Sequence, residues 1–204
     1  TEELAPVTAA GGAASSAGVG VAPTINVLSE TTIASVGRGA TINAQNGVAA
    51  GTPGVVVKAS DDTSIVSVAG SLGAGGSVGV AVGADVLSLV KNTSASIDSG
   101  VTSLVDGDID VRALSTEDIT SVAAGLALGG TGGIGVNASV HVLDLQTRAF
   151  IGDDPTDTVT SAGAGNIVAQ GTVRVAADDR TEMDKVVATL AAGGTVGVGA
   201  AATV

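Results

Sequence analysis

The stretch AAGGTVGVGAAATV (Ala191–Val204) has two close relatives earlier in the chain, GAGGSVGVAVGADV (Gly73–Val86) and ALGGTGGIGVNASV (Ala127–Val140). After each Gly-Gly pair, Val or Ile alternates with Gly or another small residue. Alternation with a period of two is typical of a β-strand. The segment GGTGGIG contains five glycines, each about 1 kcal/mol less favourable than Ala in a helix interior. These stretches therefore predict strands.

The Gly-Gly pairs also define a repeat. Their second glycines, Gly12, Gly76, Gly130 and Gly194, are separated by 64, 54 and 64 residues. The segments VVVKAS, IDVRAL and VRVAAD, which begin at residues 55, 109 and 173, are again separated by 54 and 64. We therefore predict a single repeat array of about three units of roughly 60 residues. Its approximate copies are 1–60, 61–114, 115–178 and 179–204, and we expect the first to begin, and the last to stop, within a repeat.

The runs on both sides of each Gly-Gly pair predict a hairpin whose tight turn needs glycines with positive φ. In the first copy about five extra residues separate the pair from Val19, so we expect a longer turn there. The Val and Ile face is expected to fill the core. The small-residue face is expected to admit a close backbone, within the chain or between chains. This predicts packing or assembly positions at Gly79, Gly83, Gly133, Gly135, Gly197 and Gly199.

Shorter alternating runs between turn-forming Gly, Asn and Asp residues fill the rest of each copy, as in Ala40–Ala44. Long and short strands at a regular spacing predict an all-β fold, an elongated β-solenoid-like array with long Gly-Gly hairpins. A chain of linked β-sandwich modules is the alternative. The sequence alone leaves both open.

Composition excludes several classes of function. The formal net charge of −12 disfavours nucleic-acid partners. One Phe, no Tyr and no Trp leave few aromatic surfaces for a small-molecule substrate. The uncharged runs 63–84, 119–143 and 186–204 have the length of a membrane span, but they are rich in glycine and lack flanking basic clusters. We therefore expect no membrane span, and partners that are further repeats of the same chain or other copies of it.

Candidate chemistry is sparse. His141 is the single histidine and lies on the small-residue face of a predicted strand, so we predict no catalytic or cofactor-binding residue and no enzyme activity. Acidic turns are the remaining candidates, since calcium takes oxygen ligands from such loops. Solvated turn carboxylates are the alternative interpretation. The candidate calcium ligands are Asp106, Asp108 and Asp110 in one turn and Asp153, Asp154 and Asp157 in another.

The module VxASxxTxITSVAGxLxxGGxxGVGxxxxVNVLxxTTxAxIGxGATVNA is carried by Ser115–Val142, Thr63–Val86 and Ile25–Ala44. It resembles the repeats of very large bacterial surface proteins, the filamentous, leukotoxin-type adhesins and related giant repeat proteins. The resemblance implies secretion, a cell-surface location and an elongated stalk without catalysis. We therefore expect a structural repeat region of an extracellular adhesin or filament, giving reach and assembly through β-strand stacking. The alternative is a calcium-binding extracellular module whose Asp-rich loops stiffen the array.

Overall fold

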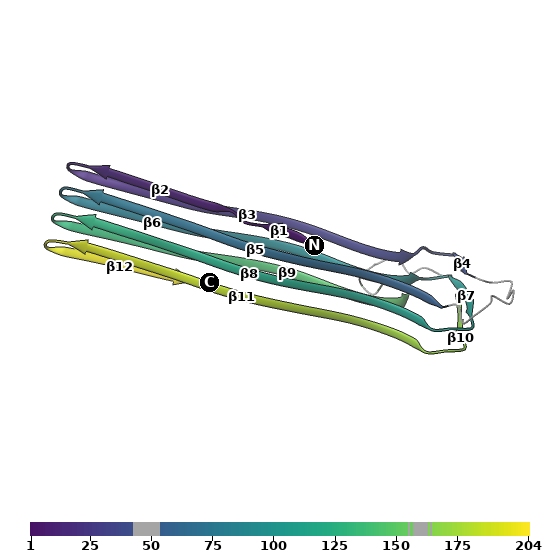
Figure 1. Cartoon of the computed structure of the whole chain (residues 1–204). Helices are drawn as coiled ribbons and strands as arrows, with labels where there is room; N and C mark the ends of the chain where they lie inside the picture. Colours follow the sequence, from purple (N-terminus) through teal and green to yellow (C-terminus); the bar gives the residue numbers. More distant parts are fainter. Residues whose placement is uncertain (43–53, 155, 157–162, 164) are drawn as a thin grey trace.

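The computed structural model describes residues 1–42, 54–154, 156, 163 and 165–204. In this part of the chain the regular elements are all β-strands, and the chain follows the same path in successive coils (Figure 1). The strands are β1 (Glu2–Leu4), β2 (Val7–Ala14), β3 (Ala17–Val36), β4 (Thr41–Ile42), β5 (Val55–Gly75), β6 (Val78–Asp98), β7 (Thr102–Val105), β8 (Ile109–Gly129), β9 (Gly132–Gly152), β10 (Asn166–Ala169), β11 (Val173–Gly193) and β12 (Val196–Thr203).

The strands form three parallel sheets, and each strand pairs with its equivalent in the neighbouring coil. One long sheet has the order β1-β5-β8-β11, with β2 also paired to β5, and the other has the order β3-β6-β9-β12. A short third sheet, β4-β7-β10, lies at one end of the long strands and takes one strand from each of three coils (Figure 1). β1 and β2 flank Pro6, which has no backbone N–H to continue the ladder. The fold is therefore an all-β, β-solenoid-like array.

The predicted Gly-Gly hairpins are wrong in one respect. β5 and β6 are joined by the two residues Gly76 and Ser77, but they belong to different sheets and each pairs with neighbouring coils. The turn is thus an arc between two facing sheets, because the backbone groups of both strands are already used by the parallel ladders. Positive φ angles among the described glycines occur at Gly39, Gly100 and Gly152, outside the arcs.

The first arc also differs from its prediction. β2 and β3 are joined by Ser15 and Ser16, a connection as short as the others. Gly12 pairs with Gly73, so the first register is 61 residues and the predicted spacing of 64 is wrong. The pair Gly11-Gly12 lies inside β2 and does not mark the turn. The later registers, Val55 with Ile109 and Ile109 with Val173, have the predicted spacings of 54 and 64.

The predicted core face is wrong as well. In β6 the small residues Gly79, Ala81 and Gly83 face the opposite sheet and are buried, whereas the intervening valines point outward and are half-buried. Val196 and Val198, expected in a core, are 55% and 52% exposed. Valine does not fit between the sheets here, because they approach to backbone contact.

Larger side chains fill the space farther from the arcs. Ile65, Leu87, Leu89 and Ile119 form one buried cluster between the long sheets. A second cluster lies where the third sheet closes the coil, and it includes Val57, Ala59, Ala95, Ile97, Val101, Val105, Ile109, Val111 and Ala113. The core therefore widens from the arcs toward the third sheet. The described part of the chain holds no helix that is long and apolar enough to cross a membrane.

Candidate functional site

The six glycines predicted as packing positions lie on the inner faces of β6, β9 and β12. A Cβ atom added at Gly79 would lie 2.0 Å from the carbonyl oxygen of Leu128, and one at Gly133 would lie 2.4 Å from that of Ala192. Gly197 is similarly close to Ala191. At Gly83, Gly135 and Gly199 the nearest atoms belong to the side chains of Asn137 or Thr189. Except at Gly83, whose neighbour Asn137 lies in the same sheet, these positions let the two long sheets of one chain approach each other.

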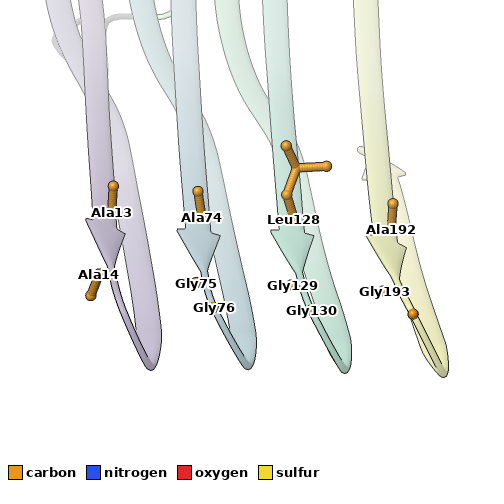
Figure 2. A pocket seen from close by; sticks show the side chains of 11 residues that line it. Ala13, Ala14, Ala74, Gly75, Gly76, Leu128, Gly129, Gly130, Ala192 and Gly193 are labelled. Carbon is orange, nitrogen blue, oxygen red and sulfur yellow. The ribbon is translucent and has the colours of Figure 1, made fainter.

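Open grooves cross β2, β5, β8 and β11 near the arcs. The one beside the arcs, seen in Figure 2, has a volume of about 780 Å³ and is lined by Ala, Gly and Leu128. A second groove of about 650 Å³ runs farther along the same strands, between residues such as Leu72, Leu126 and Leu190. Apart from Ser71 and Thr189 in the second groove, the linings offer only aliphatic groups and peptide bonds. Neither groove has the titratable side chains of a reaction site.

A polar layer centred on Asp85 lies between the glycine-lined region and the first apolar cluster. The Asp85 carboxylate accepts hydrogen bonds from Ser67 Oγ at 2.5 Å and from Ser121. It also contacts His141 Nε2 at 2.8 Å, and both side chains are fully buried. Burial acts to raise the pKa of Asp85, but hydrogen bonds from His141, Ser121 and Ser67 outweigh it and hold the pKa below its ordinary value. The layer links four strands of two neighbouring coils: β5 and β6 in one coil, and β8 and β9 in the next.

This combination of Ser, His and Asp lacks the geometry of a catalytic relay. Ser139 Oγ lies 3.3 Å from His141 Nε2, the same nitrogen that contacts Asp85. A relay needs the nucleophile and the carboxylate on opposite ring nitrogens. The other nitrogen, Nδ1, is buried without a hydrogen-bond partner among the described residues. The arrangement therefore joins the sheets and does not activate Ser139.

A second polar layer surrounds Lys91, which is only 1% exposed. Its Nζ lies 2.9 Å from Glu117 Oε1 and donates to Thr63 Oγ1 at 2.8 Å. Carboxylate oxygens of Asp61 and Glu30 lie 3.6 and 3.9 Å away. One buried cation thus faces three carboxylates, contributed by β3, β5 and β8.

The Lys91 layer extends through all four coils. Thr181 on β11 donates to Glu117 at 2.9 Å, and Thr63 donates to Glu30 at 2.7 Å. Burial raises the pKa of Glu30, although the hydrogen bond from Thr63 and the charge of Lys91 act in the opposite direction. Because its members lie at one position along the strands, the layer fits a single register of the strands.

The candidate calcium ligands are each held by separate partners. In the first turn, Asp106 accepts from Gln170, Asp108 accepts from the Thr172 backbone N–H at 2.7 Å, and Asp110 forms an ion pair with Arg112. Among the described residues no three acidic or histidine side chains are arranged to hold a metal ion.

In the second turn, Asp153 lies 3.7 Å from Arg38, and Asp154 accepts from the backbone N–H and hydroxyl of Thr156. These hydrogen bonds lower the pKa of Asp154. Asp157 lies outside the described residues. Calcium binding therefore stays a prediction.

Sequence reasoning placed His141 on the small-residue face but missed the Asp85 and Lys91 layers. The sequence does contain a signal for them. Asp85, Lys91 and Glu117 occupy the same alternate positions, and therefore the same strand face, as the inner glycines and alanines of their strands. Comparison with known proteins supplies no relative, since no family model, no curated protein and no solved structure matches this chain.

Proposed function

We propose that this chain is a structural repeat region of an extracellular adhesin or filament. The observation that carries the proposal is the in-register parallel pairing of long strands in every coil, for example along the whole of β5, β8 and β11. In such arrays each coil contacts mainly its neighbours, so the stability of the array grows with each coil added. This arrangement suits a structural stack that lengthens by the addition of coils.

The exposed edges support growth of the stack. β3 and β11 each have a long hydrogen-bonding edge that no described strand covers. Unpaired backbone groups at a sheet edge are templates for another strand. Further repeats of the same chain, or another copy of it, are the partners that fit such an edge.

The buried polar layers supply the register. Lys91 pairs with carboxylates of the preceding and following coils, and the equivalent position in the next coil is Leu145. A shift of one coil would place Leu145 among the carboxylates and leave them buried without a cation, which is strongly unfavourable. The layers therefore favour one order of coils.

The extracellular location rests on the resemblance of the repeated module to giant bacterial surface proteins. The absence of Cys and the net charge of −12 are compatible with it. Adhesion itself would then be performed by other parts of the assembly or by a surface of the stack. Protease treatment of intact producing cells, followed by detection of the chain with an antibody, tests this location directly.

Electron microscopy of the purified chain in negative stain tests the stack. Long fibres would identify assembly by edge pairing, and fibre diffraction should then show the strand spacing of about 4.8 Å along the fibre axis. Short particles of constant, elongated shape would identify a spacer within a longer chain. Spherical particles, or fibres with strands running along their axis, would contradict the proposal.

A further inference from the structure

The outer face of the β3-β6-β9-β12 sheet is apolar beside the arcs in all four coils. The residues paired across it form continuous rows that run from coil to coil. One such row is Val19, Val80, Ile134 and Val198. The exposed side chains reach 69% at Ile25 and 77% at Val27. This region, the outer positions 17–27 and those in register with them, is called the valine face below.

The valine face carries no charged residue in any coil. The first charge along the same outer positions is Asp144, which is in register with Ser29 and Val90. Of the described charges, Asp85 is buried on the inner face of this sheet, and the others lie nearer the third sheet or on the other long sheet.

The size of the valine face matches a stable interface. Four strands about 4.8 Å apart and ten residues of about 3.3 Å each cover roughly 600 Å² of flat area. Exposed apolar patches on monomeric proteins are about 300–600 Å², and a standard interface buries about 800 Å² of accessible surface per partner. Because the side chains corrugate the surface, its accessible area exceeds the flat estimate.

The relief of the face is self-complementary. The row that contains Val21, Val82 and Val136 forms a ridge, and the adjacent row with Pro23, Ala84 and Ala138 forms a shallow trough. A two-fold axis parallel to the stacking direction, placed between these rows, brings the ridge of one copy over the trough of the other. Such isologous contact needs a surface that fits itself.

We propose that the valine face pairs with the valine face of a second copy of this chain. The two-fold axis parallel to the stack makes the facing strands antiparallel, so the arc-side halves overlap and the acidic halves point in opposite directions. Like charges are thereby kept apart. The order of coils remains the same in both copies, so two arrays of any length can pair side by side. This lateral contact does not depend on edge pairing or on an extracellular location.

The predicted dimer has a characteristic length. A strand of 21 residues spans about 70 Å, and an overlap of about 33 Å gives a dimer about 105 Å long in the strand direction. Pairing through sheet edges would instead lengthen the particle perpendicular to the strands, by about 19 Å for four coils. Small-angle scattering combined with sedimentation equilibrium separates the two modes.

The test places one charge on each outer face. Val136→Lys puts a lysine in the centre of the valine face, where the native side chain is 44% exposed. Leu190→Lys is the matched control on the outer face of the other long sheet, where the native side chain is 63% exposed. Val136→Thr keeps the β-branched shape and gives a milder change. Circular dichroism confirms that each variant retains its strands.

We expect the wild type to be a dimer of the stated length at about 100 µM. The dissociation constant of the Val136→Lys dimer should be at least about tenfold higher, whereas Leu190→Lys should remain dimeric. Val136→Thr should lie between the wild type and Val136→Lys. A monomeric wild type, or an equal effect of Val136→Lys and Leu190→Lys, would overturn the proposal. So would flotation of the wild type with phosphatidylcholine vesicles in place of dimer formation.

Discussion

Each long strand passes through two regions that pack in opposite ways. Beside the arcs, glycines such as Gly79 face inward, the sheets meet backbone to backbone, and valines face solvent. Beside the third sheet, Ile97 and Ile109 fill the interior and charged residues such as Arg112 lie outside. The size of the inward residues thus sets the distance between the sheets, since protein interiors leave little empty space. We refer to these regions as the narrow half and the wide half.

The largest effect is expected for a substitution in the Lys91 layer, which lies at the boundary between the two halves. We expect Lys91→Leu to lower the free energy of unfolding by about 3–5 kcal/mol, because three carboxylates lose their buried cation. Leucine already occupies the equivalent position 145, so a leucine side chain fits at this point of the strand. The loss of stability therefore measures the effect of removing the charge. Urea unfolding followed by circular dichroism measures it. Adding Glu117→Gln should recover part of the loss, and an unchanged midpoint in Lys91→Leu would contradict the role of the layer.

The next largest effect concerns the narrow half itself. Gly79→Ala should cost about 2–3 kcal/mol, because the new Cβ would lie 2.0 Å from a backbone oxygen of the opposite sheet. Gly70→Ala is the matched control, since its Cβ would face outward with its nearest neighbour at 3.9 Å. That change should be neutral or stabilise by up to about 1 kcal/mol, as alanine is less flexible than glycine. Equal midpoints for the two variants would show that the sheets are not in close contact.

A smaller, pH-dependent effect tests the Asp85 layer. The pKa of Asp85 is lowered in the folded chain, so its ionised form stabilises the fold above pH about 4, and this contribution is lost as the pH falls through the folded-state pKa. Asp85→Asn does not titrate. The difference in unfolding free energy between wild type and Asp85→Asn should therefore be largest near pH 7 and shrink below pH about 4. The raised pKa of Glu30 affects both proteins and cancels in the difference. A difference that stays constant over this range would exclude a lowered pKa.

The smallest expected effect is that of calcium on the turns of the wide half. The carboxylates of Asp106, Asp108 and Asp110 have different partners, so we expect millimolar calcium to leave the melting temperature within about 1 °C of its calcium-free value. Magnesium at the same concentration controls for ionic strength. A calcium-specific rise of several degrees would support the calcium-binding alternative.

The sequence predicted the strands and two of the three registers because alternation and landmark spacing are local properties. It did not identify the inward face. Burial of valine is the usual rule, so the valine face was assigned to the main core and the glycine face only to close backbone contact. The rule fails here because two sheets in backbone contact leave no room for valine, a fact that depends on the facing sheet.

The first arc shows a similar limit. The Gly-Gly pair was the strongest landmark, but the pairing of Gly18 with Gly79 shows that alternation after the turn defines the true register. The partners of Lys91 could not be predicted either, because Glu30 and Glu117 come from other coils. Such contacts can be predicted only once the stacking order of the coils is known.

The parallel stacking of wide coils has a mechanical consequence. Each coil of about 60 residues advances the stack by one strand spacing of about 4.8 Å, so an array reaching 1,000 Å would need about 200 coils, or roughly 12,000 residues. The same array would be about 70 Å wide along its strands and only two sheets thick over the narrow half. A ribbon of that section bends readily across its thin dimension and resists bending in the plane of its strands. Movement of such an array would therefore be confined largely to one plane.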